Sequence, residues 1–337
     1  MIKSLNLPVL SFTFDPPTAP ESAEIFLPSE VESFGDGLWY VLKNAIQHIV
    51  PSIAEAGGIC MSLIAIVLMI SLLESFFGSA KRTAQLVGTI TIAVILIQPA
   101  NALINLGIET VQQMSEYGKL LLPVMTAALA AQGGATSSAA LYAGTVLFDS
   151  VLSTALSTIV IPLVYVYMAL SIANNVIADN IIQSIAKFVK WLMTWCLKII
   201  LYVFTGYISI TGVVSGTVDA AAIKATKIAI NGAVPVVGNI ISDASEAILV
   251  SAGLMKNSAG VFGLLTILAL WIGPFIQIAV QYLLLKLTAG VCDIFTSKQT
   301  VNVIKDFSGI MGLLLAVTGT MCLLLLISIV CFMRGVS

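Results

Sequence analysis

Apolar residues gather into long runs along the chain, and short polar segments separate these runs. The first two extend over about 59–77 and 84–106, with the basic pair Lys81–Arg82 between them. Four more cover about 150–172, 191–214, 258–285 and 309–333. Each approaches or exceeds the ~20 apolar residues that a helix needs to cross a bilayer. The runs lack the alternation of barrel strands, so the pattern predicts an all-α, polytopic helical membrane protein.

Two further apolar regions are too interrupted for one regular span. The first has a short arm at 120–131, which ends at the turn Gln132–Gly134 before a second arm. The second covers 232–253, with Asp243 and Glu246 at its break. Such patterns are typical of re-entrant hairpins or broken helices, whose backbone persists at membrane depth only where protein or a polar cavity satisfies it.

Three segments have apolar residues at helical spacing opposite polar ones, at about 108–118, 176–190 and 217–231. In the first, Ile108 and Met114 share one face. This pattern predicts helices that lie in the membrane interface and are suited to docking partners there.

The order of elements indicates an internal duplication. Pro123 and Pro235 are 112 residues apart, and so are Pro162 and Pro274. All four prolines are candidate helix breaks. Repeats that flank broken helices are the build of many secondary transporters, although hairpins also recur in helical membrane proteins without duplication.

These patterns divide the chain into four parts. Residues 1–45 form an acidic, proline-containing arm, and 46–118 form a transmembrane hairpin followed by an interfacial helix. The two membrane repeats are expected at 119–216 and 217–337. The arm lacks the apolar core of a signal peptide, and the basic loop at Lys81–Arg82 favours a cytoplasmic loop with the arm outside.

The composition excludes several classes of function. The chain has 337 residues, of which 58% are hydrophobic and 9% charged, against ~25% charged in soluble domains. A net charge of −2 gives no basic surface for nucleic acid. The five cysteines stand singly without metal-ligand spacing, and the only histidine is His48. No phosphate-binding loop or hydrolase motif is present, so we expect neither an enzyme nor a cofactor.

Polar residues within the apolar runs are the informative positions, because burying them in hydrocarbon is costly. Glu74 is either an ion-linked carboxylate or a side chain that reaches the interface near Lys81. Asp149, Asp243 and Glu246 are functional carboxylates or helix N-caps. The glycine turn either lines a polar path or allows close packing. The candidate residues are Glu74, Gln132, Gly133, Gly134, Asp149, Asp243 and Glu246.

Several short motifs occur in a characteristic order: Pro-Val-Met-Thr at 123–126, Gly-Gly at 133–134, Ile-Pro-Leu at 161–163 and Pro-Val-Val-Gly at 235–238. With them, residues 50–333 resemble the stage III sporulation protein AE family of endospore-forming bacteria. The resemblance implies a membrane subunit of the channel, or feeding tube, between mother cell and forespore, required for late forespore gene expression. The expected location is the mother-cell membrane around the forespore.

The resemblance also implies partners but supplies no catalytic or binding residues. The partners are the other stage III sporulation A-series proteins, including a cytoplasmic ATPase, and indirectly stage II sporulation protein Q. A homo-oligomer embedded in the lipid bilayer is a further expectation.

Two other functions remain open. A self-contained secondary transporter for a small metabolite predicts polar residues from both repeats around one midplane cavity. A non-conducting scaffold predicts hairpins that are packed shut. A channel subunit predicts a polar surface at subunit contacts.

Overall fold

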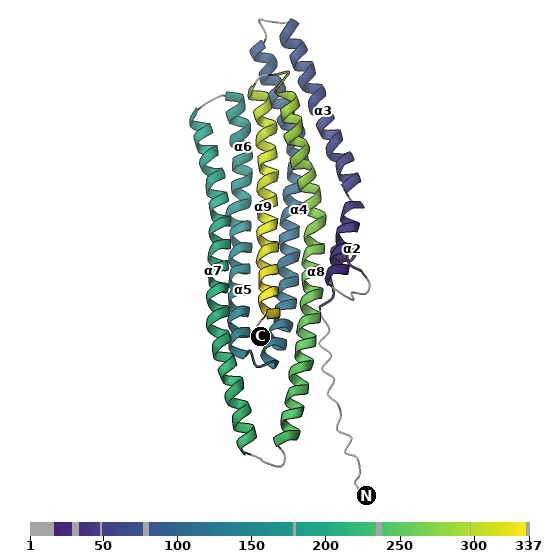
Figure 1. Cartoon of the computed structure of the whole chain (residues 1–337). Coiled ribbons are helices and arrows are strands. Elements are labelled where there is room, and N and C mark those ends of the chain that lie inside the picture. Colours follow the sequence, from purple (N-terminus) through teal and green to yellow (C-terminus); the bar gives the residue numbers. More distant parts are fainter. Residues whose placement is uncertain are drawn as a thin grey trace.

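The computed structural model describes residues 17–28, 34–47, 49–76, 81–177, 180–233, 238–296 and 298–334, and of residues 81 and 209–256 the backbone alone. Within these ranges the regular elements are all helical (Figure 1). They are α1 (Glu21–Glu24), α2 (Phe34–Gln47), α3 (Ile49–Phe76), α4 (Lys81–Ala131), α5 (Ala135–Ala155), the π-helical segment η2 (Leu156–Val160), α6 (Ile161–Ile177), α7 (Asn180–Ala233), α8 (Gly238–Cys292) and α9 (Lys298–Arg334).

Six helical stretches are long and apolar enough to cross a membrane. They are Phe34–Phe76, Arg82–Ala131, Ala135–Ile177, Asn180–Ile208, Asn257–Cys292 and Lys298–Arg334. The predicted class, an all-α polytopic membrane protein, is therefore confirmed.

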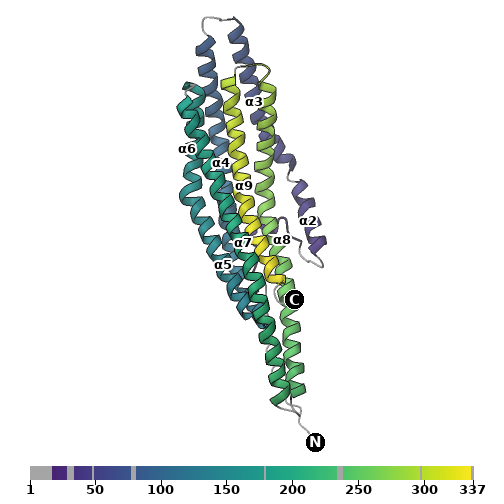
Figure 2. The same cartoon turned by 60° about the vertical axis from the view of Figure 1, so that its left-hand side comes forward.

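Helix α9 occupies the centre of the bundle, where it contacts α4, α5, α6, α7 and α8 (Figures 1 and 2). Many of its apolar side chains are almost completely enclosed, including Phe307, Met321 and Phe332. Side chains therefore fill the centre of the described bundle as they fill the core of a soluble protein.

The turn between α4 and α5 lies at the predicted glycine pair. Gly133 has φ of 89°, a left-handed conformation that favours glycine. The N–H groups of Gly133 and Gly134 donate to the carbonyls of Ala130 and Leu129, at 2.9 and 3.1 Å, which caps the end of α4. The predicted break is correct, but its arms belong to the long stretches Arg82–Ala131 and Ala135–Ile177 and do not form a short re-entrant pair.

The prolines do not end helices where the structure describes them. Helix α4 continues through Pro123 and α8 through Pro274. Pro162 is the second residue of α6, two positions after the end of η2 at Val160. A proline lacks the N–H and crowds the carbonyl four residues earlier, and a widened π turn relieves this crowding. Long membrane helices tolerate such positions when neighbours cover the freed carbonyls. Pro235 lies outside the described residues.

The predicted interfacial helix at 108–118 is not a separate element. It lies within α4, and its apolar residues Val111 and Met114 are buried in the bundle. The segment 176–190 contains the α6–α7 connection, and 217–231 lies within α7. The helical periodicity of 108–118 was real, but its apolar face packs on protein instead of entering the membrane surface.

The described part of the acidic arm packs against the bundle. The Phe26 side chain is buried, and its ring would lie 3.2 Å from a Cβ on Gly273 of α8. Ser22 Oγ donates to Gln113 Oε1 of α4 at 2.8 Å. Residues 17–28 therefore help to form one face of the molecule. The internal duplication stays a prediction.

Candidate functional site

Aromatic and basic residues near the start of α7 mark one boundary of the layer of the bundle that is apolar enough to lie in a membrane. The rings of Phe188, Trp191 and Trp195 stack on each other with centroids 5.9 and 5.7 Å apart, and both tryptophans are half exposed. Exposed tryptophans of this kind are typical of the bilayer–water interface. Lys190 Nζ would lie 3.0 Å from a Cβ on Gly309, so this boundary is level with Gly309 of α9.

From Gly309, α9 continues for about 25 uncharged residues before Arg334. At 1.5 Å per residue this stretch covers roughly 37 Å, enough for a hydrocarbon core of ~30 Å. Helix α8 runs alongside it and carries no charge over 257–285. We call this layer, which contains residues 309–333 of α9, the membrane band.

The middle of α4 lies inside this band. A Cβ on Gly107 would lie 3.6 Å from Leu314, and one on Gly118 would lie 3.0 Å from Leu325. Residues 107–118 of α4 therefore run beside residues 314–325 of α9.

One outer face of this part of α4 is polar. Its exposed residues recur three or four positions apart and so share one side of the helix. We call them the polar stripe: Asn105, Glu109, Gln112 and Glu116. A carboxylate in a lipid-facing position costs ~2.5–3.5 kcal/mol or more, so the polar stripe requires water or protein beside it.

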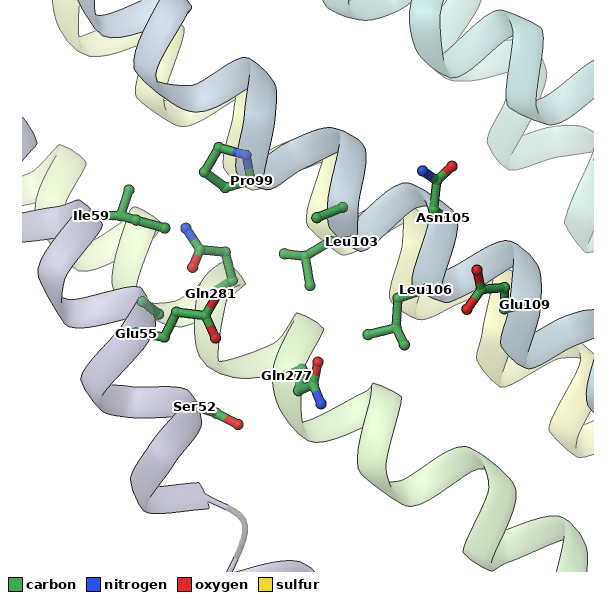
Figure 3. A pocket seen from close by; sticks show the side chains of 12 residues that line it. Ser52, Glu55, Ile59, Pro99, Leu103, Asn105, Leu106, Glu109, Gln277 and Gln281 are labelled. Carbon is green, nitrogen blue, oxygen red and sulfur yellow. The ribbon is translucent and has the colours of Figure 1, made fainter. Parts of the chain in front are cut away.

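A cleft of about 300 Å³ lies beside the polar stripe, between α3, α4 and α8 (Figure 3). We call it the polar cleft. Its polar lining residues are Ser52 and Glu55 of α3, Asn105 and Glu109 of α4, and Gln277 and Gln281 of α8. A second hollow of about 450 Å³ shares Ser52, Glu55, Glu109 and Gln277 and reaches the α1 segment at Ser22 and Phe26.

The polar groups of this cleft are incompletely paired. In the described part of the chain, neither Glu55 nor Glu109 forms a hydrogen bond or an ion pair with another residue. The Gln281 side chain is 5% exposed, and its Nε2 has no hydrogen-bond partner among the residues that the structure describes. Such groups are costly in a dry interior and common where a ligand or a partner binds.

Asp149, one of the predicted candidates, is buried between α4 and α5. It lies well inside α5 and so does not cap that helix. Its Oδ2 accepts a hydrogen bond of 2.7 Å from Ser115 Oγ, while its Oδ1 is buried and has no partner within the described ranges. One turn earlier, Thr145 Oγ1 donates to Ser328 Oγ of α9 at 2.9 Å. These polar contacts hold α5 against α4 and α9 within the membrane band.

A second carboxylate, Asp306 near the start of α9, is held by three donors from α6. Ser171 Oγ and Asn175 Nδ2 donate to its Oδ2 at 2.5 and 3.0 Å, and Tyr167 Oη donates to its Oδ1 at 3.3 Å. All three donor residues are buried. This arrangement fixes the position of α9 against α6 and has a structural role.

The other predicted site residues are scattered over the molecule. Glu74 lies two residues before Phe76, where α3 ends. Gln132 lies in the α4–α5 turn with its Oε1 buried and unpaired in the described region. Asp243 and Glu246 lie within α8, after its start at Gly238, so neither is its N-cap. The structure does not bring Glu74, the glycine turn and Asp149 together into one site.

The polar cleft was not predicted from the sequence, because its residues come from three segments that are far apart in the chain. One signal was readable. Gln277 and Gln281 are two amides four residues apart within an otherwise apolar run, so they share a helix face that cannot favour lipid.

The fold and these polar positions define a polytopic helical membrane protein with a laterally placed polar cleft. Residues 32–335 match the family model described as stage III sporulation protein AE. The chain therefore belongs to the stage III sporulation protein AE family.

The chain is similar to the stage III sporulation protein AE of Bacillus subtilis (strain 168), with 22% identity over 265 residues. The match covers 77% of this chain and 66% of the relative, just under two thirds of that protein's length. No solved structure matches the chain.

Proposed function

We propose that the protein is an integral membrane subunit of the channel complex between mother cell and forespore, and that it serves late forespore gene expression during endospore formation. Its place is the mother-cell membrane around the forespore. Its partners are other stage III sporulation A-series proteins, among them a cytoplasmic ATPase, with stage II sporulation protein Q as an indirect partner. Membership of the family supports the sporulation role.

The observation that best supports the role of a subunit is the position of the polar stripe within the membrane band. Glu109 and Glu116 are exposed on α4 beside residues 314–325 of α9. Lipid would disfavour this face, whereas a neighbouring subunit or a water-filled path between subunits would stabilise it. The centre of the single chain is filled by residues such as Phe307 and Phe332, which favours a path formed between subunits.

A self-contained transporter is supported less well. That function predicts a central cavity lined by both repeats. The polar cleft is instead lateral, and its lining residues come from 52–109 and 277–281, with none from the first repeat at 119–216.

The test is a null strain complemented with the full chain, scored for heat-resistant spores and for a late forespore reporter. We expect the null strain to stall after engulfment, and the chain to restore both readouts and to co-purify with A-series proteins. Normal sporulation of the null strain would contradict the proposal.

A variant of the buried carboxylate provides a finer test. Asp149→Asn keeps an acceptor for Ser115 at similar volume, so we expect normal accumulation in the membrane. If the charge or the proton of Asp149 serves transport, spore yield should fall at least tenfold. Wild-type spore yield would assign Asp149 a packing role only.

A further inference from the structure

We propose that the polar cleft binds a cationic nitrogen group, an ammonium or a guanidinium, between Glu55 and Glu109. This inference rests on the proposed function for one point, the membrane setting of the cleft. It goes further by naming the chemistry of the group that occupies the cleft.

The charge of the cleft calls for a cation. Glu55 from α3 and Glu109 from α4 both line it, and in the described residues neither has a cationic partner. Both side chains are exposed and lie at opposite ends of the cleft (Figure 3), so together they make it negatively charged along its length. A bound cation would offset this charge.

The Gln281 amide provides an independent indication of a ligand. Gln281 lines the cleft and is only 5% exposed. Its Nε2 has no hydrogen-bond partner in the part of the chain that the structure describes. Figure 3 places Gln281 and Gln277 on α8 facing α3 and α4. Because Nε2 donates a hydrogen bond, the ligand that satisfies the cleft carries an acceptor oxygen near its cationic nitrogen.

The lining suits an organic cation better than a metal ion. Within the described ranges no group of three or more His, Cys, Asp or Glu residues could hold a metal. Beside the carboxylates lie Ile59, Leu103 and Leu106, an apolar wall for the methylene groups of a lysine or arginine type of side chain. A cleft of about 300 Å³ is also in the range of small-ligand sites.

Two kinds of molecule carry a cationic nitrogen group of this type. The cation is either a free solute, or the side chain of a Lys or Arg residue in a membrane helix of a partner subunit. Both carry a cationic nitrogen. A solute with a carboxylate or carbonyl oxygen also supplies the acceptor for Gln281, whereas in a partner helix a second, acceptor side chain has to supply it.

The first arm uses the purified full-length chain with N-acetylargininamide as the probe. Its neutral analogue N-acetylcitrullinamide is the matched control ligand, and binding is measured by saturation-transfer NMR and titration. We expect only the arginine compound to bind, and Glu55→Gln, Glu109→Gln and Gln281→Leu each to weaken binding at least tenfold. Glu24→Gln, on the exposed face of α1, removes the same charge outside the cleft and should bind as the wild type does.

The second arm uses the chain in its native membranes, with Leu106 replaced by the photoreactive residue p-benzoylphenylalanine. If the partner supplies the cation, the crosslink should map to an apolar segment with a Lys or Arg residue. Neutralising that residue should then reduce assembly as much as the double change Glu55→Gln and Glu109→Gln does.

Probe binding that the glutamate variants lose supports a free solute, and a crosslink to a basic membrane helix supports a partner side chain. If the charged and neutral probes bind alike, or not at all, and the crosslinks reach no basic residue, the inference is overturned. A null strain that sporulates normally would refute the proposed function and leave the binding result on the purified chain intact.

Discussion

The hairpin of α3 and α4 and the pair α8–α9 are equally apolar but differently packed. The span Phe34–Phe76, which contains α3, has a peak mean hydropathy of 2.5, and α9 has 2.6. Yet 28% of the α3-containing window is buried within the chain, against 61% for α9 and 56% for α8. Hydropathy therefore identifies both as membrane helices and does not tell which one forms the core.

The difference in burial arises from the positions of the helices along the long axis of the bundle. Thr89 of α4 and Thr300 of α9 lie within hydrogen-bond distance, at 3.3 Å, so the apolar start of α4 lies beyond the boundary at Gly309. The tip of the hairpin extends past the other helices (Figure 1). Large side chains such as Leu72 and Phe76 are left exposed there. The exposed apolar tip of this hairpin therefore needs an apolar partner surface beyond the membrane band, whereas α9 is mostly covered by its own chain.

The largest difference in stability between the two regions is expected when an aromatic side chain in each is truncated to alanine. Phe307→Ala in α9 removes a ring that is 1% exposed and should lower the free energy of unfolding by about 3–5 kcal/mol. Phe76→Ala in α3 removes one that is 78% exposed and should change it by less than about 0.5 kcal/mol. Unfolding in mixed micelles, followed by circular dichroism, measures both. Equal losses would erase the distinction between the two regions.

A second contrast compares two aspartates near the start of α9. Asp306→Ala leaves the buried donors Tyr167, Ser171 and Asn175 without their acceptor, which should cost about 2–3 kcal/mol. Asp293→Ala removes a half-exposed ion pair with Lys305 at 3.2 Å and should cost at most about 1 kcal/mol. The same unfolding assay decides the matter. A cost at Asp306 no larger than at Asp293 would show that α6 does not position α9.

The smallest difference is expected from two glycine-to-alanine substitutions, which should change the free energy of unfolding in opposite directions. A Cβ on Gly263 of α8 would lie 2.3 Å from a methyl group of the fully buried Leu121, so Gly263→Ala should destabilise by about 1–3 kcal/mol. A Cβ on Gly58 of α3 would meet nothing within 4 Å, so Gly58→Ala should stabilise by up to about 1 kcal/mol through helix propensity. Shifts of the same sign would contradict the packing described for the two regions.

The sequence predicted the class of fold and the α4–α5 turn, because apolar run length and a Gly-Gly pair are local signals. It predicted a separate interfacial helix at 108–118, where α4 is in fact continuous. An amphipathic segment has the same periodicity whether its apolar face meets lipid or protein, so residues 108–118 did not indicate that Met114 would pack inside the bundle.

The candidate site was harder to predict than the fold. Asp149 was a candidate intramembrane polar residue in the sequence, but its partner Ser115 is 34 residues away in the chain. The polar cleft combines Glu55, Glu109 and Gln281, and no local pattern specifies which helices become neighbours. Only the assembled bundle places the polar stripe of α4 beside the part of α9 that lies in the membrane band.

The central claim is that the polar stripe lies at membrane depth and does not face lipid. Spin labels at Gln112 of the stripe and at Tyr202, which is 70% exposed on α7, test it most directly in the full chain in bilayers, after the native cysteines are replaced. Their collision rates with oxygen, which partitions into lipid, and with a water-soluble nickel complex are compared. We expect both labels to be at similar depth, with Tyr202 in lipid and Gln112 accessible to the nickel complex or enclosed by a neighbouring subunit. A label at Gln112 that collides with oxygen as freely as the one at Tyr202 would contradict the account.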